Sequence, residues 1–148
     1  MKKKKNKLHV TDIFGFEKRT SQELPLFLAN VPAGFPSPAD DYIDRKLDLN
    51  EYLIRHPAAT FFVRVEGESM TGAGIHSGDV LIVDRALEPA DKKIVIASVN
   101  GDLTVKRIRQ HKGKFYLAPE NPDFEPIEIN QEEGITIWGV VTYVLHPL

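Results

Sequence analysis

From residue 60 onward, short runs of β-branched and aromatic residues alternate with tight-turn signals, and this pattern constrains the fold more than any other feature. The strongest turn signal is Asn100-Gly101, which separates Ile94–Val99 from Leu103–Ile108 and is typical of a two-residue hairpin. The other runs are Thr60–Val65, Val80–Val83, Lys114–Leu117, Ile127–Ile129 and Ile135–Leu145. Because turns recur about every eight to twelve residues, the chain is predicted to be mainly β. We expect a compact, strongly bent antiparallel β-domain over residues 41–148.

The first forty residues show no sustained hydrophobic period and are rich in proline. Residues 32–41 read PAGFPSPADD, a composition that favours turns and extended chain. We therefore expect residues 1–40 to form an extended, largely irregular N-terminal arm. The arm carries an apolar patch, which we expect to lie on the β-body or on a second copy of the chain. The patch consists of Leu24, Leu26, Phe27 and Leu28.

One short helix is predicted between the arm and the first β-rich run. Asp48 is a candidate N-cap, and Glu51 follows at the spacing of a capping box. An apolar stripe accompanies the cap, and Pro57 should end the helix after His56. The stripe consists of Leu49, Leu53 and Ile54.

Composition excludes several classes of protein. The 148 residues include no cysteine, so disulfides, thiolate metal sites and cysteine nucleophiles are absent. The five histidines are scattered without a ligand spacing, and we expect neither a metal nor a cofactor. No apolar run is long enough for a membrane span, and no apolar stretch follows the lysine-rich start as a signal peptide requires. These features predict a cytoplasmic protein.

The charge is unevenly distributed. Residues 1–33 carry seven Lys/Arg and three acids, a net charge of +4, whereas the rest carries 12 basic and 18 acidic groups, a net charge of −6. A body of that sign is not suited to binding phosphate backbones. The lysine run at residues 2–7 is interpreted as a solvated tail, with a nucleic-acid or partner contact as the alternative.

Three short features could together carry chemistry, although each has an ordinary structural interpretation. Gly67-Glu-Ser-Met70 follows a predicted strand, and its serine could be a local cap. Lys106 could be an edge-strand lysine that discourages aggregation, and Ala33-Gly34 could be linker. Together, however, they make a coherent reaction.

A serine attacks a peptide carbonyl only if a base takes its proton, and no Ser-His-Asp order is evident here. Lys106 can be that base if it is neutral. Its pKa, about 10.4 for a free side chain, must then fall by roughly three units, equivalent to about 4 kcal/mol. Burial among apolar neighbours can lower a lysine pKa by that amount, and Lys106 lies between Val105 and Ile108 on a predicted hairpin strand.

These motifs resemble the LexA/UmuD-like self-cleaving serine peptidases over roughly residues 24–145. The resemblance rests on Gly67–Met70, Gly78–Asp84 and Gly101–Arg107. It implies that Ser69 is the nucleophile, that Lys106, 37 residues later, is the base, and that the bond Ala33-Gly34 is the cleavage site. The glycine suits such a bond because it tolerates the φ values of a kinked segment.

Within the family, the chain resembles the UmuD-type members more than the repressors. The stretch Ala33–Tyr42 carries much of this similarity. Only 33 residues precede Gly34, and they include Pro25 and Pro32, so two DNA-binding helices should not fit there. Two features depart from the UmuD pattern: Ala-Gly stands where Cys-Gly is common, and the start is rich in lysine.

The resemblance implies a bacterial SOS-response protein that acts as a homodimer. Such proteins cleave themselves when they meet the RecA–single-stranded-DNA filament, and the shortened form joins UmuC in an error-prone translesion polymerase. The intact form is expected to restrain replication, with replicative polymerase subunits as further partners. Neither sequence-specific DNA binding nor a membrane is implied.

Two other functions compete with this interpretation. The chain could be a non-catalytic regulatory interaction module of the replication machinery with a vestigial dyad. It could also be a Ser-Lys processing peptidase that acts on other proteins, although the lack of a membrane anchor counts against that.

Overall fold

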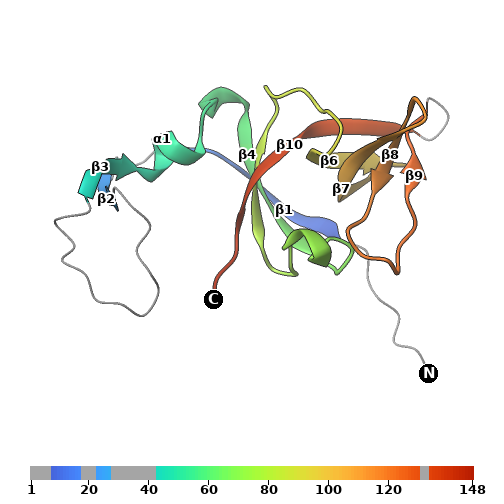
Figure 1. Cartoon of the computed structure of the whole chain (residues 1–148), viewed down its shortest axis with the longest axis horizontal. Helices are drawn as coiled ribbons and strands as arrows, with labels where there is room; N and C mark the ends of the chain where they lie inside the picture. Colours follow the sequence, from blue (N-terminus) through green and yellow to red (C-terminus); the bar gives the residue numbers. More distant parts are fainter. Residues whose placement is uncertain (1–7, 18–22, 28–42, 131–133) are drawn as a thin grey trace. The chain divides into compact units, whose positions relative to one another are not determined.

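The computed structural model describes residues 8–17, 23–27, 43–130 and 134–148 (Figure 1). The chain divides into two compact units. One contains the residues up to Phe16 together with Ala58–Leu148, and the other is Glu17–Pro57. No helix in the described ranges is long and apolar enough to cross a membrane.

The first unit is built on one antiparallel sheet of eight strands. They are β1 (His9–Gly15), β4 (Thr60–Glu66), β5 (Val80–Asp84), β6 (Ile94–Val99), β7 (Asp102–His111), β8 (Lys114–Ala118), β9 (Ile127–Glu128) and β10 (Ile135–Leu145). Their order in the sheet is β1-β4-β5-β10-β6-β7-β8-β9. The start of β1 also pairs with β7, at His9 and Thr104, so the first six strands of this order close into a ring. The predicted mainly β, bent antiparallel fold is confirmed.

The β6–β7 hairpin forms where Asn100-Gly101 predicts it. Both turn residues have positive φ, 51° at Asn100 and 87° at Gly101, as a two-residue turn matching the strand twist requires. Val99 faces Asp102 directly across this turn. The turn therefore fixes the register that places Lys106 opposite Val95.

Strand β10 joins the two halves of the ring because it bends. Its first half pairs with β6 and its second half with β5, with register shifts at Ile137/Gly139 and Val141/Tyr143. Such irregularities bend a strand and raise its local twist. Gly139 lies at one of them, where an added Cβ would be 2.8 Å from Cγ1 of Val83.

The bent sheet buries side chains on both of its faces. One cluster fills the ring and contains Leu8, Val63, Val65, Met70, Ile75, Leu81, Val83, Ile96 and Val105. The second cluster contains Val95, Ala97, Ile108, Leu117 and Val140. Strand β6 contributes Ile96 to the first cluster and its two neighbours to the second, because successive side chains of a strand point to opposite faces.

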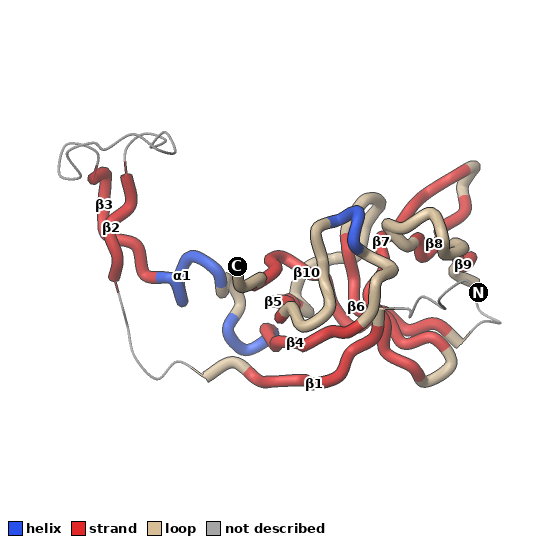
Figure 2. The backbone as a smooth tube through the Cα atoms, turned by 90° about the horizontal axis from the view of Figure 1, so that it is seen from below, coloured by secondary structure: helices blue, strands red, loops and turns tan. Residues whose placement is uncertain are grey.

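The second unit contains a two-stranded antiparallel sheet and the predicted helix. Strand β2 (Glu23–Phe27) pairs with β3 (Ile43–Asp48), and α1 (Leu49–Leu53) follows (Figure 2). Asp48 caps the helix as predicted, since its side chain accepts a hydrogen bond of 2.9 Å from the N–H of Asn50. The helix ends earlier than expected, because Ile54 is already extended, with φ −116° and ψ 95°.

Strands within residues 1–40 differ from the expected irregular arm. Strand β1 was missed because its residues are largely exposed, so it lacks the alternation of a half-buried strand. Strand β2 contains Pro25, which a two-stranded sheet tolerates because each strand has a free edge. The two units meet in sequence at residues 16/17 and 57/58, whereas the sequence predicted a boundary at residue 40. The Ala33-Gly34 bond, the lysine run and the side chains of the Leu24–Leu28 patch lie outside the described residues.

Candidate active site

Ser69 lies in the loop that leaves β4. Gly67 turns the chain out of the strand with a φ of 116°, a conformation that favours glycine. Met70 is fully buried in the ring cluster and anchors the next position. Between them Ser69 is itself fully buried, with an exposed fraction of 0%. We call residues 67–74 the nucleophile loop.

Lys106 reaches the serine from β7. Its Nζ donates a hydrogen bond of 3.0 Å to Ser69 Oγ, and its exposed fraction is only 4%. Two residues 37 positions apart, each predicted from the sequence, are therefore in direct contact. Because burial disfavours the charged form of an amine, this position favours neutral lysine, the form that can accept a hydroxyl proton.

A third contact at the serine was not anticipated from the sequence. The N–H of Leu8, the residue before β1, donates a hydrogen bond of 2.9 Å to Ser69 Oγ. The carbonyl of Leu8 accepts one of 2.8 Å from Oγ1 of Thr104, two positions before Lys106 on β7. The Leu8 side chain is fully buried in the ring cluster. The start of β1 thus lies directly on the serine–lysine pair.

Backbone contacts with the segment after β8 brace the nucleophile loop. The Glu120 N–H donates to the Ser69 carbonyl, and the Gly72 N–H donates to the Glu120 carbonyl, each at 2.8 Å. A Cβ on Gly72 would be 2.5 Å from that same carbonyl oxygen, so the close approach requires glycine. Asn121 adds a hydrogen bond of 3.0 Å from its side chain to the Glu68 carbonyl.

The side chain of Glu120 connects this brace to the strand that carries Lys106. Its carboxylate pairs with Arg107, the next residue on β7, and with Arg109 at 3.2 Å. The sequence does not single out Glu120, because the contacts that hold Ser69 are made by the main chain of Glu120. The only available signal was the Pro119–Pro122 turn composition, which does not reveal what the turn contacts.

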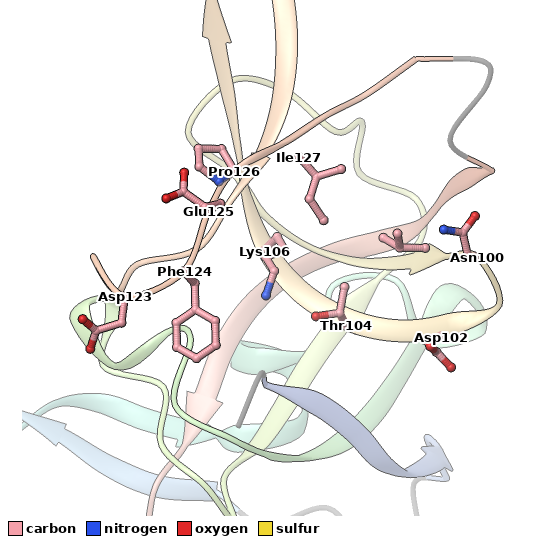
Figure 3. Close-up of a pocket in the computed structure, with 10 residues that line it drawn as sticks. Asn100, Asp102, Thr104, Lys106, Asp123, Phe124, Glu125, Pro126 and Ile127 are labelled. Atoms are coloured by element: carbon pink, nitrogen blue, oxygen red, sulfur yellow. The ribbon is translucent and has the colours of Figure 1, made fainter. Parts of the chain in front are cut away.

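A pocket of about 530 Å³ adjoins Lys106, and Ser69 is not among the residues that line it. Thr104 and Lys106 lie on the same face of β7, since alternate residues of a strand share a face, and both line the pocket (Figure 3). The apolar part of the lining comes from Val99, Phe124, Pro126 and Ile127, and the polar part also includes Asn100, Asp102, Asp123 and Glu125. A peptide in this pocket would lie beside the lysine amine.

The histidines of the described residues include one close polar contact. His146 Nδ1 lies 2.6 Å from Oδ1 of Asp79, and its ring centroid is 5.2 Å from that of His76. Within the described ranges, no three or more His, Asp or Glu side chains are grouped closely enough to hold a metal ion.

A buried serine hydroxyl in contact with a buried lysine, beside a pocket on a closed β framework, is the arrangement that a serine peptidase with a lysine base needs. The comparisons with known proteins agree with this class. Residues 25–142 match the Peptidase S24-like family. The chain belongs to this family, and the resemblance to the LexA/UmuD-like peptidases is confirmed.

Three relatives show how far the similarity extends. The chain is 51% identical over 122 residues to protein SamA of Salmonella typhimurium, an alignment that covers 82% of this chain and 84% of that protein. It is 45% identical over 128 residues to protein MucA of Escherichia coli, covering 84% and 87%. It is 42% identical over 125 residues to the LexA repressor of Acidithiobacillus ferrooxidans, covering 82% of this chain and 60% of the repressor.

Proposed function

We propose that this chain is a self-cleaving serine peptidase of the SOS response, which cuts its own Ala33-Gly34 bond. The observation that carries the proposal is the 3.0 Å hydrogen bond between Lys106 Nζ and Ser69 Oγ, made where both groups are buried. Membership of the Peptidase S24-like family supports it, because it makes a peptide bond the expected substrate.

The proposed reaction proceeds through an ester. Neutral Lys106 takes the proton of Ser69 Oγ, which attacks the Ala33 carbonyl carbon. The tetrahedral intermediate collapses as the lysine gives that proton to the departing Gly34 amine, and an ester joins Ser69 to Ala33. The lysine then takes a proton from water, which attacks the ester, and the proton passes to Ser69 Oγ. Backbone N–H groups beside the serine would stabilise each oxyanion.

The test of this function follows the chain by intact mass spectrometry at alkaline pH and with the RecA–single-stranded-DNA filament. The expected product is a 115-residue fragment that begins at Gly34. Ser69→Ala and Lys106→Ala should each abolish it, because nucleophile and base act as one unit. Circular dichroism checks that both variants fold. Normal cleavage by either folded variant would contradict the assignment.

The biological setting is part of the same proposal. The chain forms a homodimer, and its shortened form serves a UmuC-type translesion polymerase, with replicative polymerase subunits as further partners. The similarity to SamA and MucA, which are UmuD-like relatives, supports this setting. Co-purification of UmuC with the shortened form, but not with uncut Ser69→Ala, is the expected result.

A non-catalytic interaction module is the second candidate, and one observation favours it. Ser69 is fully buried and is contacted by the Leu8 N–H, so the pair is covered in this conformation. Under that alternative the 115-residue fragment never appears, with or without the filament.

A further inference from the structure

Leu8 covers the dyad, and both of its main-chain polar groups, the N–H and the carbonyl, are hydrogen-bonded to residues of the site. The Leu8 N–H is bonded to Ser69 Oγ, and the Leu8 carbonyl is bonded to Thr104 on the strand of the base. His9 continues in register with Thr104 on β7 and with Glu66 on β4. Residues 8–10, which we call the cap segment, are therefore bound as an extended strand, the usual form in which a cleft binds a peptide by its main chain.

The cap segment leaves the serine unable to react. When the Ser69 hydroxyl gives its proton to Lys106, its oxygen keeps two lone pairs, and the Leu8 N–H occupies one of them. That hydrogen bond lowers the reactivity of the oxygen toward a carbonyl carbon. The 0% exposure of Ser69 also shows that no carbonyl from outside can reach Oγ.

We propose that the dyad lies in a strand-binding cleft whose resting occupant is the chain's own cap segment, and that the cleavage segment must displace it. The ligand class is an extended peptide that forms main-chain hydrogen bonds and places an aliphatic side chain where Leu8 lies. This inference rests on the proposed function. It adds the cap segment, which lies far from Ala33-Gly34 in sequence, as a competitor for the position that the substrate must occupy.

The structure shows how the cap segment could leave without unfolding the body. The register of β1 on β4 shifts between Val10 and Asp12, so a bulge separates the cap segment from the rest of the strand. Beyond the bulge the strand is mostly exposed, with Ile13 49% and Phe14 44% exposed. The cap segment is thus held by the buried Leu8 with its two hydrogen bonds, by the half-buried Val10, and by the pairing of His9 and Val10 with neighbouring strands.

A reversible crosslink in the full chain tests this directly, because the chain has no cysteine of its own. His9→Cys with Glu66→Cys replaces a register pair whose side chains already meet at 3.9 Å, a placement suited to a disulfide. Oxidation should hold the cap segment on the dyad and slow cleavage of Ala33-Gly34 by at least about tenfold relative to the same protein after reduction. Equal rates in the two states would overturn the proposal.

A matched control locks β1 on the other side of the bulge. Asp12→Cys with Arg64→Cys also replaces an exposed, ion-paired register pair. Oxidation there should leave the cap segment free to lift and change the cleavage rate by less than about twofold. Slowing as large as that of the first pair would show a general effect of crosslinking and would overturn the inference.

A binding measurement keeps the inference separate from the proposed function. Absence of cleavage in the reduced proteins would count against the function alone. In a Ser69→Ala background, the reduced His9/Glu66 cysteine pair should bind a labelled peptide of residues 28–38, LANVPAGFPSP, and the oxidised protein should bind it at least about tenfold more weakly. Equal binding in both states, or binding in neither, would overturn the cleft and its occupant whether or not the chain cleaves itself.

Discussion

The nucleophile loop and the cap segment both contact Ser69 Oγ, yet they are held in different ways. The loop is fixed by two main-chain hydrogen bonds with Glu120, a side-chain bond from Asn121 and the buried Met70. The cap segment is held by the single fully buried side chain of Leu8, the half-buried Val10 and strand pairing, and it ends at a bulge. The difference indicates that Ser69 and Lys106 are already in contact in this conformation. Under the proposed function, a stimulus would then need only to change what lies over them.

The largest effect on the rate of self-cleavage should come from pH, which sets the protonation state of Lys106. If neutral Lys106 is the base, the rate of spontaneous self-cleavage should rise by about tenfold per pH unit while pH remains below the lysine pKa, and then level off. The sign follows because deprotonation creates the base. Cleavage is measured by intact mass between pH about 5 and 10, because burial can bring a lysine pKa below 7; a rate that is flat over the whole of that range would contradict lysine as the base.

The brace on the nucleophile loop should be the next most sensitive feature. Gly72→Ala places a Cβ 2.5 Å from the Glu120 carbonyl oxygen, so the loop and the segment that holds Ser69 must separate. A displacement of about 1 Å can cost about a hundredfold in rate, and we expect a loss of that size in self-cleavage. Urea unfolding should show a destabilisation of about 1–3 kcal/mol.

Gly15→Ala is the matched control, because an added Cβ there has nothing within 4 Å. It should cleave at the wild-type rate. If Gly72→Ala also cleaved normally while folded, the brace would not be what positions the serine.

The cap segment should respond in the opposite direction. Leu8→Ala removes most of the buried side chain that holds it, while Ser69, Lys106 and the brace remain. Truncation of a buried leucine costs about 2–5 kcal/mol. Much of that loss lowers the stability of the whole ring, and only the remainder releases the cap segment. We therefore expect self-cleavage to become about tenfold faster. Thr11→Val, which removes only the exposed contact with the Arg64 carbonyl, should leave the rate unchanged. Slower cleavage by folded Leu8→Ala would contradict the idea that the cap segment restrains the serine–lysine pair.

The sequence predicts those parts of the molecule in which the residue types themselves indicate the local structure or the chemistry. Asn100-Gly101 predicts the β6–β7 turn because its backbone needs positive φ. Ser69 and Lys106 were paired because their residue types and motifs suit one reaction, and the structure places them in contact. The burial of Leu8 beside Ser69 could not be predicted, because the cluster that buries it is formed by residues between Val63 and Val105, far away in sequence. A single leucine before an exposed strand does not indicate such a site.

The smallest effect should come from the side chain of Glu120, which tests whether the loop is braced by main chain or by charge. Glu120→Gln keeps the main-chain bonds to Ser69 and Gly72 and weakens only the pairing with Arg107 and Arg109. These side chains are between about a quarter and a half exposed, so solvent screening limits the pairing to about 1 kcal/mol or less. Self-cleavage should slow by no more than about fivefold. Glu128→Gln, which removes the exposed pair with Lys114 at 3.7 Å, is the control and should leave the rate unchanged. If Glu120→Gln instead slowed cleavage as much as Gly72→Ala does, the ion pairs with β7, and not the main-chain bonds, would be what holds Ser69 against Lys106.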